Sequence, residues 1–137
     1  MAAPISPEQV SGEAALLTIQ EIVAFLQEHL GQRMTAYIGG VNDPKMVARW
    51  ISHQNLPRDE PQMRLRECYQ AARLLVDAYG SDTAKAWLSG SNAELGDQAP
   101  AYMLRRARTW EDLRTIVPAA RAFARAATGQ PPPLRHG

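Results

Sequence analysis

The apolar residues of this 137-residue chain recur at spacings of three and four, and this spacing constrains the fold more than any other feature. The clearest series consists of Leu16, Ile19, Val23, Leu26 and Leu30. Residues three and four apart share one face of an α-helix, so the series predicts an amphipathic helix over residues 13–30. No convincing run of alternating apolar and polar residues occurs, and we therefore expect an all-α fold.

Glycine and proline residues divide the rest of the chain into further helices. Glycine favours the position after a helix and proline favours its first turn. On this basis we expect helices over residues 32–38, 44–55, 59–79, 83–88 and 119–127. We also expect one that begins at Pro100 and one that Thr109 caps and that contains Leu113, Ile116 and Val117. Residues 92–97 are expected to form a loop or a single turn. Residues 1–12 are expected to be a flexible lead-in, and residues 128–137 a disordered tail.

The charges are distributed unevenly, although the net charge is only +1. Residues 1–32 contain four glutamates and no basic residue, whereas residues 33–73 contain seven basic and four acidic residues. Residues 100–137 contain seven arginines and two acidic residues. This distribution can build a basic face on a nearly neutral protein, which favours an anionic partner. A GC-rich genome, which encodes arginine readily, is the alternative explanation for the excess of arginine.

Residues 34–57 predict a short helix, a glycine-containing turn and a second helix, the order of a helix-turn-helix. Lys45 and Arg49 lie four apart and share one face of the second helix, while Trp50 belongs to the opposite, apolar face. Arginine can contact guanine or phosphate, and asparagine or glutamine can read adenine, so the segment predicts DNA binding. The candidate DNA-binding residues are Arg33, Lys45, Arg49, Ser52, His53, Gln54, Asn55 and Arg58.

A helical hairpin with an ordinary solvated face is the alternative interpretation of residues 34–57. Many phage-repressor-like domains carry glycine just after the second helix, where this chain has His53. A module that has lost DNA binding and contacts only proteins therefore stays open. A functional boundary is expected near residues 58–62, between a first part (13–61) and a second part (62–127) that share the long helix.

Residues 84–100 form a second distinctive stretch, in which a helix ends on Trp87-Leu88 and several residues that permit tight turns follow. The stretch contains no reactive group. A rigid, kinked surface with an apolar anchor suits protein recognition. Alternatively, Trp87 and Leu95 simply belong to the core.

The pattern Trp87-Leu88-x-Gly90-x-Asn92-x-x-Leu95-Gly96-x-x-x-Pro100, after a long helix and an Xre-like helix-turn-helix, resembles antitoxins of the Xre/MbcA/ParS type. The resemblance covers residues 33–127 and is most specific over residues 84–117. It implies an Xre-like domain followed by a small helical toxin-binding domain. It also implies an antitoxin of a type II toxin–antitoxin pair, whose partner is a RES-domain toxin that depletes NAD. In that family the complex represses its own operon.

The resemblance further implies that the C-terminal segment covers the entrance to the NAD pocket of the toxin. The implied toxin-binding residues are Trp87, Asn92, Leu95, Gly96, Pro100, Arg121, Phe123 and Arg125. Arg121 and Arg125 share one helical face and could pair with acidic groups at the rim of such a pocket. A solvated cationic helix end, stabilised by the helix macrodipole, is the alternative.

The sequence carries no recognisable catalytic or metal-binding pattern. His29, His53 and His136 show no metal-ligand spacing with Cys68, and neither a G-x-G-x-x-G nor a P-loop pattern occurs. We expect Cys68 to be a buried structural thiol, and the protein to be no enzyme and to need no metal or cofactor. A single cysteine, no apolar run of about 20 residues and no secretory signal favour a cytoplasmic protein without a membrane partner.

The expected partners are a RES-domain toxin and operator DNA. A homodimer would supply two DNA half-sites, and a hetero-oligomer would form with the toxin. Two other functions remain as alternatives: a stand-alone helix-turn-helix transcription regulator, and a protein-binding module whose helix-turn-helix is vestigial.

Overall fold

The computed structural model describes residues 5–128, and the regular elements in this range are helical. The all-α expectation is thus confirmed for these residues, whereas residues 129–137 of the expected tail lie outside them. The α-helices are α1 (Pro7–Leu16), α2 (Ile19–Leu30), α3 (Gln32–Gly39), α4 (Lys45–Ile51), α5 (Asp59–Tyr79), α6 (Ser81–Ser89), α7 (Pro100–Arg106), α8 (Trp110–Leu113) and α9 (Ile116–Arg125). Two 3₁₀ turns, η1 (Ala93–Leu95) and η2 (Ala126–Thr128), complete the fold.

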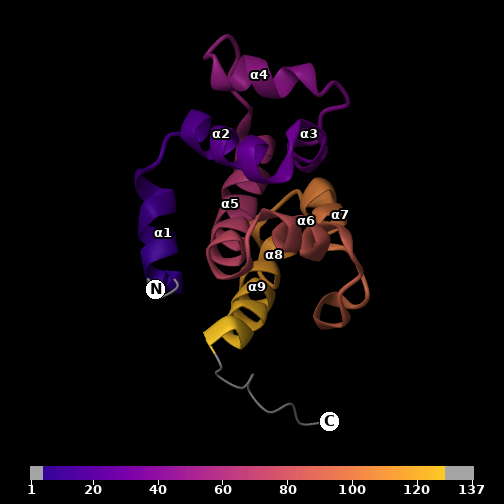
Figure 1. Cartoon of the computed structure of the whole chain (residues 1–137). Helices are drawn as coiled ribbons and strands as arrows, with labels where there is room; N and C mark the ends of the chain where they lie inside the picture. The colour runs from indigo at the N-terminus through magenta and orange to yellow at the C-terminus, as the bar shows by residue number, and fades with distance from the viewer. Residues whose placement is uncertain (1–4, 129–137) are drawn as a thin grey trace.

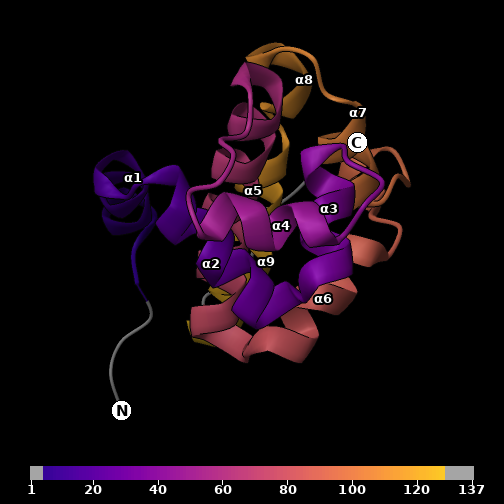
Figure 2. The same ribbon diagram turned by 90° about the horizontal axis from the view of Figure 1, so that it is seen from above.

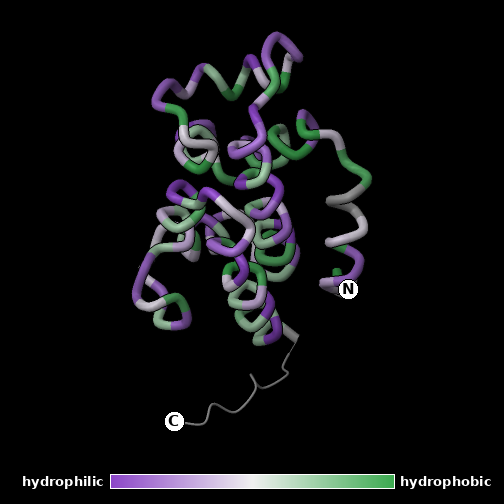
Figure 3. The backbone as a smooth tube through the Cα atoms, turned by 180° about the vertical axis from the view of Figure 1, so that it is seen from behind, coloured by the Kyte–Doolittle hydropathy of each residue, from purple (hydrophilic) through white to green (hydrophobic). Residues whose placement is uncertain are grey.

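The long helix α5 is the centre of the fold, and α1, α2, α3, α6, α7, α8 and α9 pack against it (Figures 1 and 2). One hydrophobic core extends from Ile19 in α2 through α5 to Ala120 in α9. This core runs through both the expected first part and the expected second part of the chain. Hydrophobic residues recur at short intervals among hydrophilic ones along the helices, as amphipathic packing requires (Figure 3).

The N-terminal region differs from the expected lead-in, because residues 7–12 belong to α1. Ser6 and Gln9 form a reciprocal cap: the Ser6 backbone N–H donates to Gln9 Oε1 (2.8 Å), and the Gln9 N–H donates to Ser6 Oγ (3.1 Å). Pro7 occupies the first helical position, which proline favours. Val10 is buried, and α1 packs on α5. The local cap and this apolar contact explain the extra helix.

The single helix expected over residues 13–30 is also divided, because α1 ends at Leu16 and α2 starts at Ile19. Thr18 caps α2 by accepting the Glu21 backbone N–H at 3.1 Å. Glu21 Oε1 in turn accepts the Thr18 backbone N–H at 3.3 Å. This capping box starts a new helix inside the apolar series, so the chain changes direction between Leu16 and Ile19.

Two glycines let consecutive helices meet without a loop. Gly31 ends α2 and precedes α3, and Gly80 ends α5 and precedes α6, with φ of 89° and 94°. Residues with a side chain rarely adopt such positive φ values. At both positions glycine therefore permits a sharp change of direction, as the sequence predicted.

The C-terminal helices begin at Pro100 and after Thr109 as the sequence predicted, but the helix that Thr109 caps is shorter than expected. It ends at Leu113, and Ile116 and Val117, which were expected in it, belong to α9. Pro100 begins α7, and Thr109 forms a capping box with Asp112 at the start of α8. The last helix, expected over residues 119–127, begins already at Ile116, so Pro118 lies in its first turn. Leu113 and Ile116 are fully buried, and their anchoring in the core sets where α8 ends and α9 begins.

Candidate functional site

The helix α4 presents Lys45 and Arg49 to solvent and buries Val47 and Trp50 against the core. Trp50 lies directly against Gly39 of α3, where an added Cβ would come within 2.9 Å of the indole. The close approach of α3 and α4 thus depends on the missing side chain at Gly39. Because Val47 and Trp50 bury the other face of α4, its two cations point away from the core, as their spacing predicted.

The polar residues 52–55 lie beyond α4, although the sequence predicted a helix through residue 55. The backbone of His53 has φ of 65°, in the left-handed region that a helix does not contain and that glycine favours. The backbone N–H of Gln54 then folds back to the Arg49 carbonyl at 3.0 Å. The expectation that the helix continues through residue 55 was therefore wrong, because α4 ends at Ile51 and Ser52 caps it. The side chains of Ser52, His53, Gln54 and Asn55 are all exposed in the turn.

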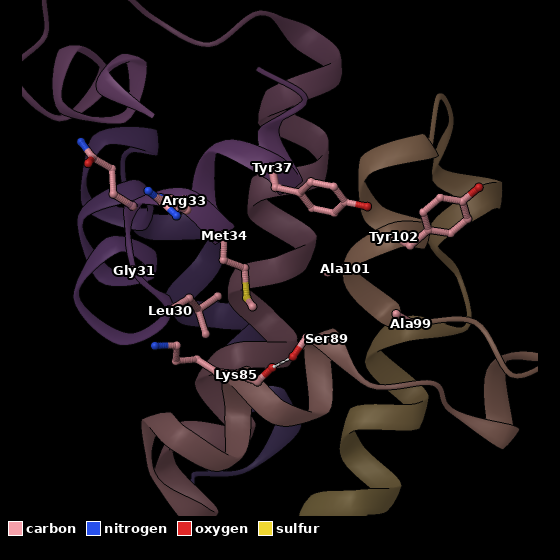
Figure 4. Close-up of a pocket in the computed structure, with 11 residues that line it drawn as sticks. Leu30, Gly31, Arg33, Met34, Tyr37, Lys85, Ser89, Ala99, Ala101 and Tyr102 are labelled. Carbon is pink, nitrogen blue, oxygen red and sulfur yellow. Dashed lines mark hydrogen bonds between the residues drawn. The ribbon is translucent and has the colours of Figure 1, made fainter. Parts of the chain in front are cut away.

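The two flanking arginines of the DNA-binding prediction lie at different places. Arg58 is exposed directly before α5, and its carbonyl accepts the Gln62 N–H at 2.9 Å. Arg33 is exposed in the first turn of α3, where it lines a groove between α3 and the helices α6 and α7 (Figure 4).

Residues 90–100 form the compact turn that the sequence predicted between two helices. Asn92 Oδ1 accepts the Glu94 N–H at 2.8 Å, and the Asn92 N–H donates to the Gln98 carbonyl at 3.2 Å. Gly96 has φ of 66°, and Leu95 is buried. These contacts make the turn rigid, because its backbone is bonded on both sides of η1.

Most residues of the motif in this turn therefore hold the structure together. Asn92 is a cap, Leu95 and Pro100 are buried, and Trp87 is half-buried against the core. Of the motif residues in the turn, Gly90 and Gly96 are exposed, and the other exposed residues are ones that the motif does not specify. These other exposed residues are Ser91, Ala93, Glu94, Asp97 and Gln98.

The C-terminal part of α9 carries the other candidate toxin-binding residues. Phe123 is 41% exposed, its ring lies 5.1 Å from the ring of Tyr79, and its carbonyl accepts the Tyr79 hydroxyl at 2.7 Å. Arg121 and Arg125 are half-buried. The 3₁₀ turn η1 packs against α9, and a hollow of about 450 Å³ lies between Glu94 and the start of α9. The structure thus brings the two candidate toxin-binding segments side by side.

A groove of about 730 Å³ between α3 and the helices α6 and α7 was not foreseen from the sequence (Figure 4). Leu30 and Met34 form an apolar part of its wall, and Tyr37 of α3 and Tyr102 of α7 also line the groove. The sequence interval between the two tyrosines is large, so no local pattern relates them. Of the lining residues, Arg33 alone was a sequence candidate.

The chain matches no family model, no curated protein and no solved structure in the comparisons made.

The chemistry of the described residues offers no reactive thiol. Cys68 is buried, as expected, and burial together with the neighbouring Glu67 raises the pKa of its thiol well above the ordinary value. Within residues 5–128, no group of three or more His, Cys, Asp or Glu residues is placed to hold a metal ion. In the same part of the chain, no helix has the length and apolarity needed to cross a membrane. The candidate sites in the described part of the chain are therefore binding surfaces: α4, the 90–100 turn with α9, and the groove.

Proposed function

We propose that this protein is the antitoxin of a type II toxin–antitoxin pair, which neutralises a RES-domain toxin and represses its own operon by binding DNA. The adjacency of the 90–100 turn and α9 carries the proposal. The turn holds the motif that resembles Xre/MbcA/ParS antitoxins, and α9 holds the segment implied to reach the toxin. A toxin large enough to span both segments would contact the turn and α9 together.

Neutralisation would use the exposed end of α9. Phe123 would enter the mouth of the NAD pocket, where an aromatic ring displaces water and excludes substrate. Arg121 and Arg125 would pair with acidic groups at the rim. The rigid turn at residues 90–100 would fix how α9 approaches, because it packs on that helix.

Replacing Phe123 with glutamate is expected to abolish protection against the toxin, because a carboxylate would then face the acidic rim. The measurement is growth and NAD content of cells that co-express each variant with the RES-domain toxin encoded beside this protein. Leu56→Glu is the matched control, since Leu56 is also exposed and lies in the distant turn before α5. Full protection by a folded Phe123→Glu variant would contradict the role of α9, and a gene neighbourhood without such a toxin would contradict the proposal itself.

Operator binding would use α4 in a helix-turn-helix formed by α3 and α4. Lys45 and Arg49 are exposed on one face of α4, and Val47 and Trp50 bury the opposite face of this helix in the core. A recognition helix needs this combination of an anchored back and polar residues that face the groove. A monomer would contact few phosphates, so a dimer would be required for firm binding.

Changing Lys45 and Arg49 together to alanine is expected to weaken operator binding at least tenfold, on the order of what the loss of one good base contact does. The slope of log affinity against log salt concentration should also become less steep, by about the amount that two phosphate contacts contribute. Fluorescence anisotropy with operator DNA at several salt concentrations measures both. Arg114→Ala is the control, because Arg114 is an exposed cation between α8 and α9, outside the helix-turn-helix. Operator affinity equal to wild type in the double variant would show that α4 is not the recognition helix.

A further inference from the structure

Four arginines gather in a cleft of about 530 Å³ that adjoins the groove of Figure 4. The arginine cleft is lined by Arg64, Arg105, Arg106 and Arg108, together with Tyr37, Gly40, Glu60 and Tyr102. The arginines come from α5, from α7 and from the segment after α7. Because Glu60 is the one carboxylate in this lining, the cleft carries a strong excess of positive charge.

Arg64 forms the floor of the arginine cleft and is only 8% exposed. Its Nη1 donates to the Ala107 carbonyl at 2.7 Å and its Nη2 to the Gly39 carbonyl at 3.4 Å, while Glu60 lies 3.9 Å away. Its Nε is buried, and among the described residues nothing accepts its hydrogen. The chain also leaves room for this guanidinium, since a Cβ at Gly40 would come within 2.9 Å of Nη2.

The positive charge of Arg64 is only partly compensated by neighbouring groups. Burial lowers the pKa of its guanidinium most, Glu60 opposes this, and Arg108 and Arg105 lower the pKa further by repulsion. A bound anion would relieve both the desolvation and the repulsion. The cleft thus keeps four cations close together with one lining carboxylate, Glu60, to balance them.

Arg105 and Arg106 are held in place by neutral groups. Arg105 donates to the Tyr37 carbonyl (2.8 Å) and to Asn42 Oδ1 (3.1 Å), and Arg106 donates to the Tyr102 hydroxyl (3.1 Å). Their guanidinium carbons lie 4.7 and 5.1 Å from the centres of the Tyr37 and Tyr102 rings. A guanidinium has five N–H donors, so donors remain free for a ligand while the side chains are already oriented.

The carboxylate of Asp112 lies near the cleft but does not line it. It accepts the backbone N–H groups of Arg108 and Thr109 at 3.0 and 3.2 Å, and these bonds lower its pKa. Asp112 thereby caps α8. Its charge offsets part of the positive charge beside Arg106 and Arg108, and four arginines against Glu60 and Asp112 still leave an excess of positive charge.

Tyr37 and Tyr102 line both the arginine cleft and the groove, so the two hollows adjoin each other at these residues. One hollow is cationic, the other is largely apolar, and aromatic rings that can stack on a base lie between them. Both volumes fall in the range of small-molecule sites. We propose that the cleft and the groove form one nucleotide-binding site, with phosphates on the arginines and the base against the tyrosines.

The buried position of Arg64 favours a small nucleotide over a nucleic-acid duplex. A terminal phosphate can enter a concave cleft, whereas the phosphates of a duplex lie along a broad convex surface and meet exposed cations. The aromatic pair distinguishes a nucleotide from a free phosphate or an acidic peptide. This site does not depend on the antitoxin proposal, because none of its phosphate-binding residues belongs to α4, to the 90–100 turn or to α9.

Calorimetric titration of the full chain with ADP, inorganic pyrophosphate and adenosine tests the site. ADP is expected to bind about tenfold more tightly than pyrophosphate, since base stacking adds to the phosphate contacts, and adenosine should bind weakest. The double variant Arg106→Gln and Arg108→Gln should lose at least tenfold in affinity for ADP and pyrophosphate. Arg114→Gln is the matched control, because Arg114 is exposed outside the cleft and pairs with Glu111 at 3.0 Å.

Tyr37→Leu separates the two halves of the site. It removes the ring and its contact with Arg105 but keeps the backbone carbonyl that holds Arg105, so the affinity for ADP should fall by more than the affinity for pyrophosphate. The proposal is overturned if neither ADP nor pyrophosphate binds at millimolar concentration, or if the double arginine variant binds ADP like wild type. It is also overturned if the double variant loses affinity for a 20-base-pair duplex while ADP binds neither protein, since the cleft would then be a DNA contact.

Discussion

Replacing Trp50 with alanine is expected to lower the free energy of unfolding by about 3–5 kcal/mol, the usual range for a large buried aromatic residue. Trp50 is 3% exposed and fills the space between α4 and α3 beside Gly39. The seven residues of α4 are too few to form a stable helix by themselves, so the helix depends on its buried side chains. We therefore expect the substitution to detach α4 from the core, and this detachment to account for much of the lost stability.

Urea unfolding followed by circular dichroism measures the loss, and Trp110→Ala is the matched control. Trp110 is 57% exposed at the start of α8, so its replacement should change the free energy of unfolding by no more than about 0.5 kcal/mol. Equal destabilisation by the two substitutions would mean that Trp50 does not anchor α4. Because Lys45 and Arg49 lie on the same helix, Trp50→Ala should also weaken any DNA binding that these residues provide.

Local patterns predicted most helices of this fold because the signals lie within a few residues of the boundaries they set. Gly31 and Gly80 mark helix ends through a backbone conformation that glycine adopts readily. Pro100 and Thr109 mark helix starts through the missing N–H of proline and the hydroxyl cap of threonine. The apolar face of α4 also followed from spacing, and Trp50 is buried as expected.

Two errors arose at capping boxes. Thr18 with Glu21 has the spacing of a capping box, yet the continuous apolar series outweighed it. Ser6 with Gln9 has the same spacing, yet the prolines and the glycine of residues 1–12 favoured a lead-in. The end of α4 has a different cause. His53 adopts a left-handed conformation in a turn that returns the chain to α5, and nothing in its own chemistry demands this.

The groove and the arginine cleft could not be predicted from the sequence, because they depend on which helices become neighbours. Periodicity assigns Tyr37 and Tyr102 to helix faces but does not tell that α3 packs against α7. Nothing in the sequence singles out Arg64 within the long helix, whereas the helices that surround α5 bury it. Side-chain spacing thus predicts faces, and only the packed fold brings Arg64 beside Arg105.

Replacing Glu67 with glutamine is expected to stabilise the protein at pH 8 by as much as about 3 kcal/mol. Burial raises the pKa of the Glu67 carboxyl to about 7, against an ordinary value of 4.5. Between these two values the folded protein binds more protons than the unfolded chain, so the free energy of unfolding falls as the pH rises. The destabilisation is complete above pH 7 and is absent below the unfolded pKa. Glutamine has nearly the same shape and no charge, so it should escape this effect.

Urea unfolding of wild type and Glu67→Gln from pH 4 to pH 8 tests the prediction, with Glu111→Gln as control. The two proteins should be about equally stable near pH 4, and the variant should gain its advantage between pH 4.5 and pH 7. Glu111 is exposed on α8, so its replacement should not produce this rise. A stability difference between wild type and Glu67→Gln that does not change with pH would mean that the Glu67 carboxyl titrates alike in the folded and unfolded protein. Since the charge of Glu67 also raises the pKa of Cys68, the same substitution should make the buried thiol easier to ionise, although burial keeps that pKa high.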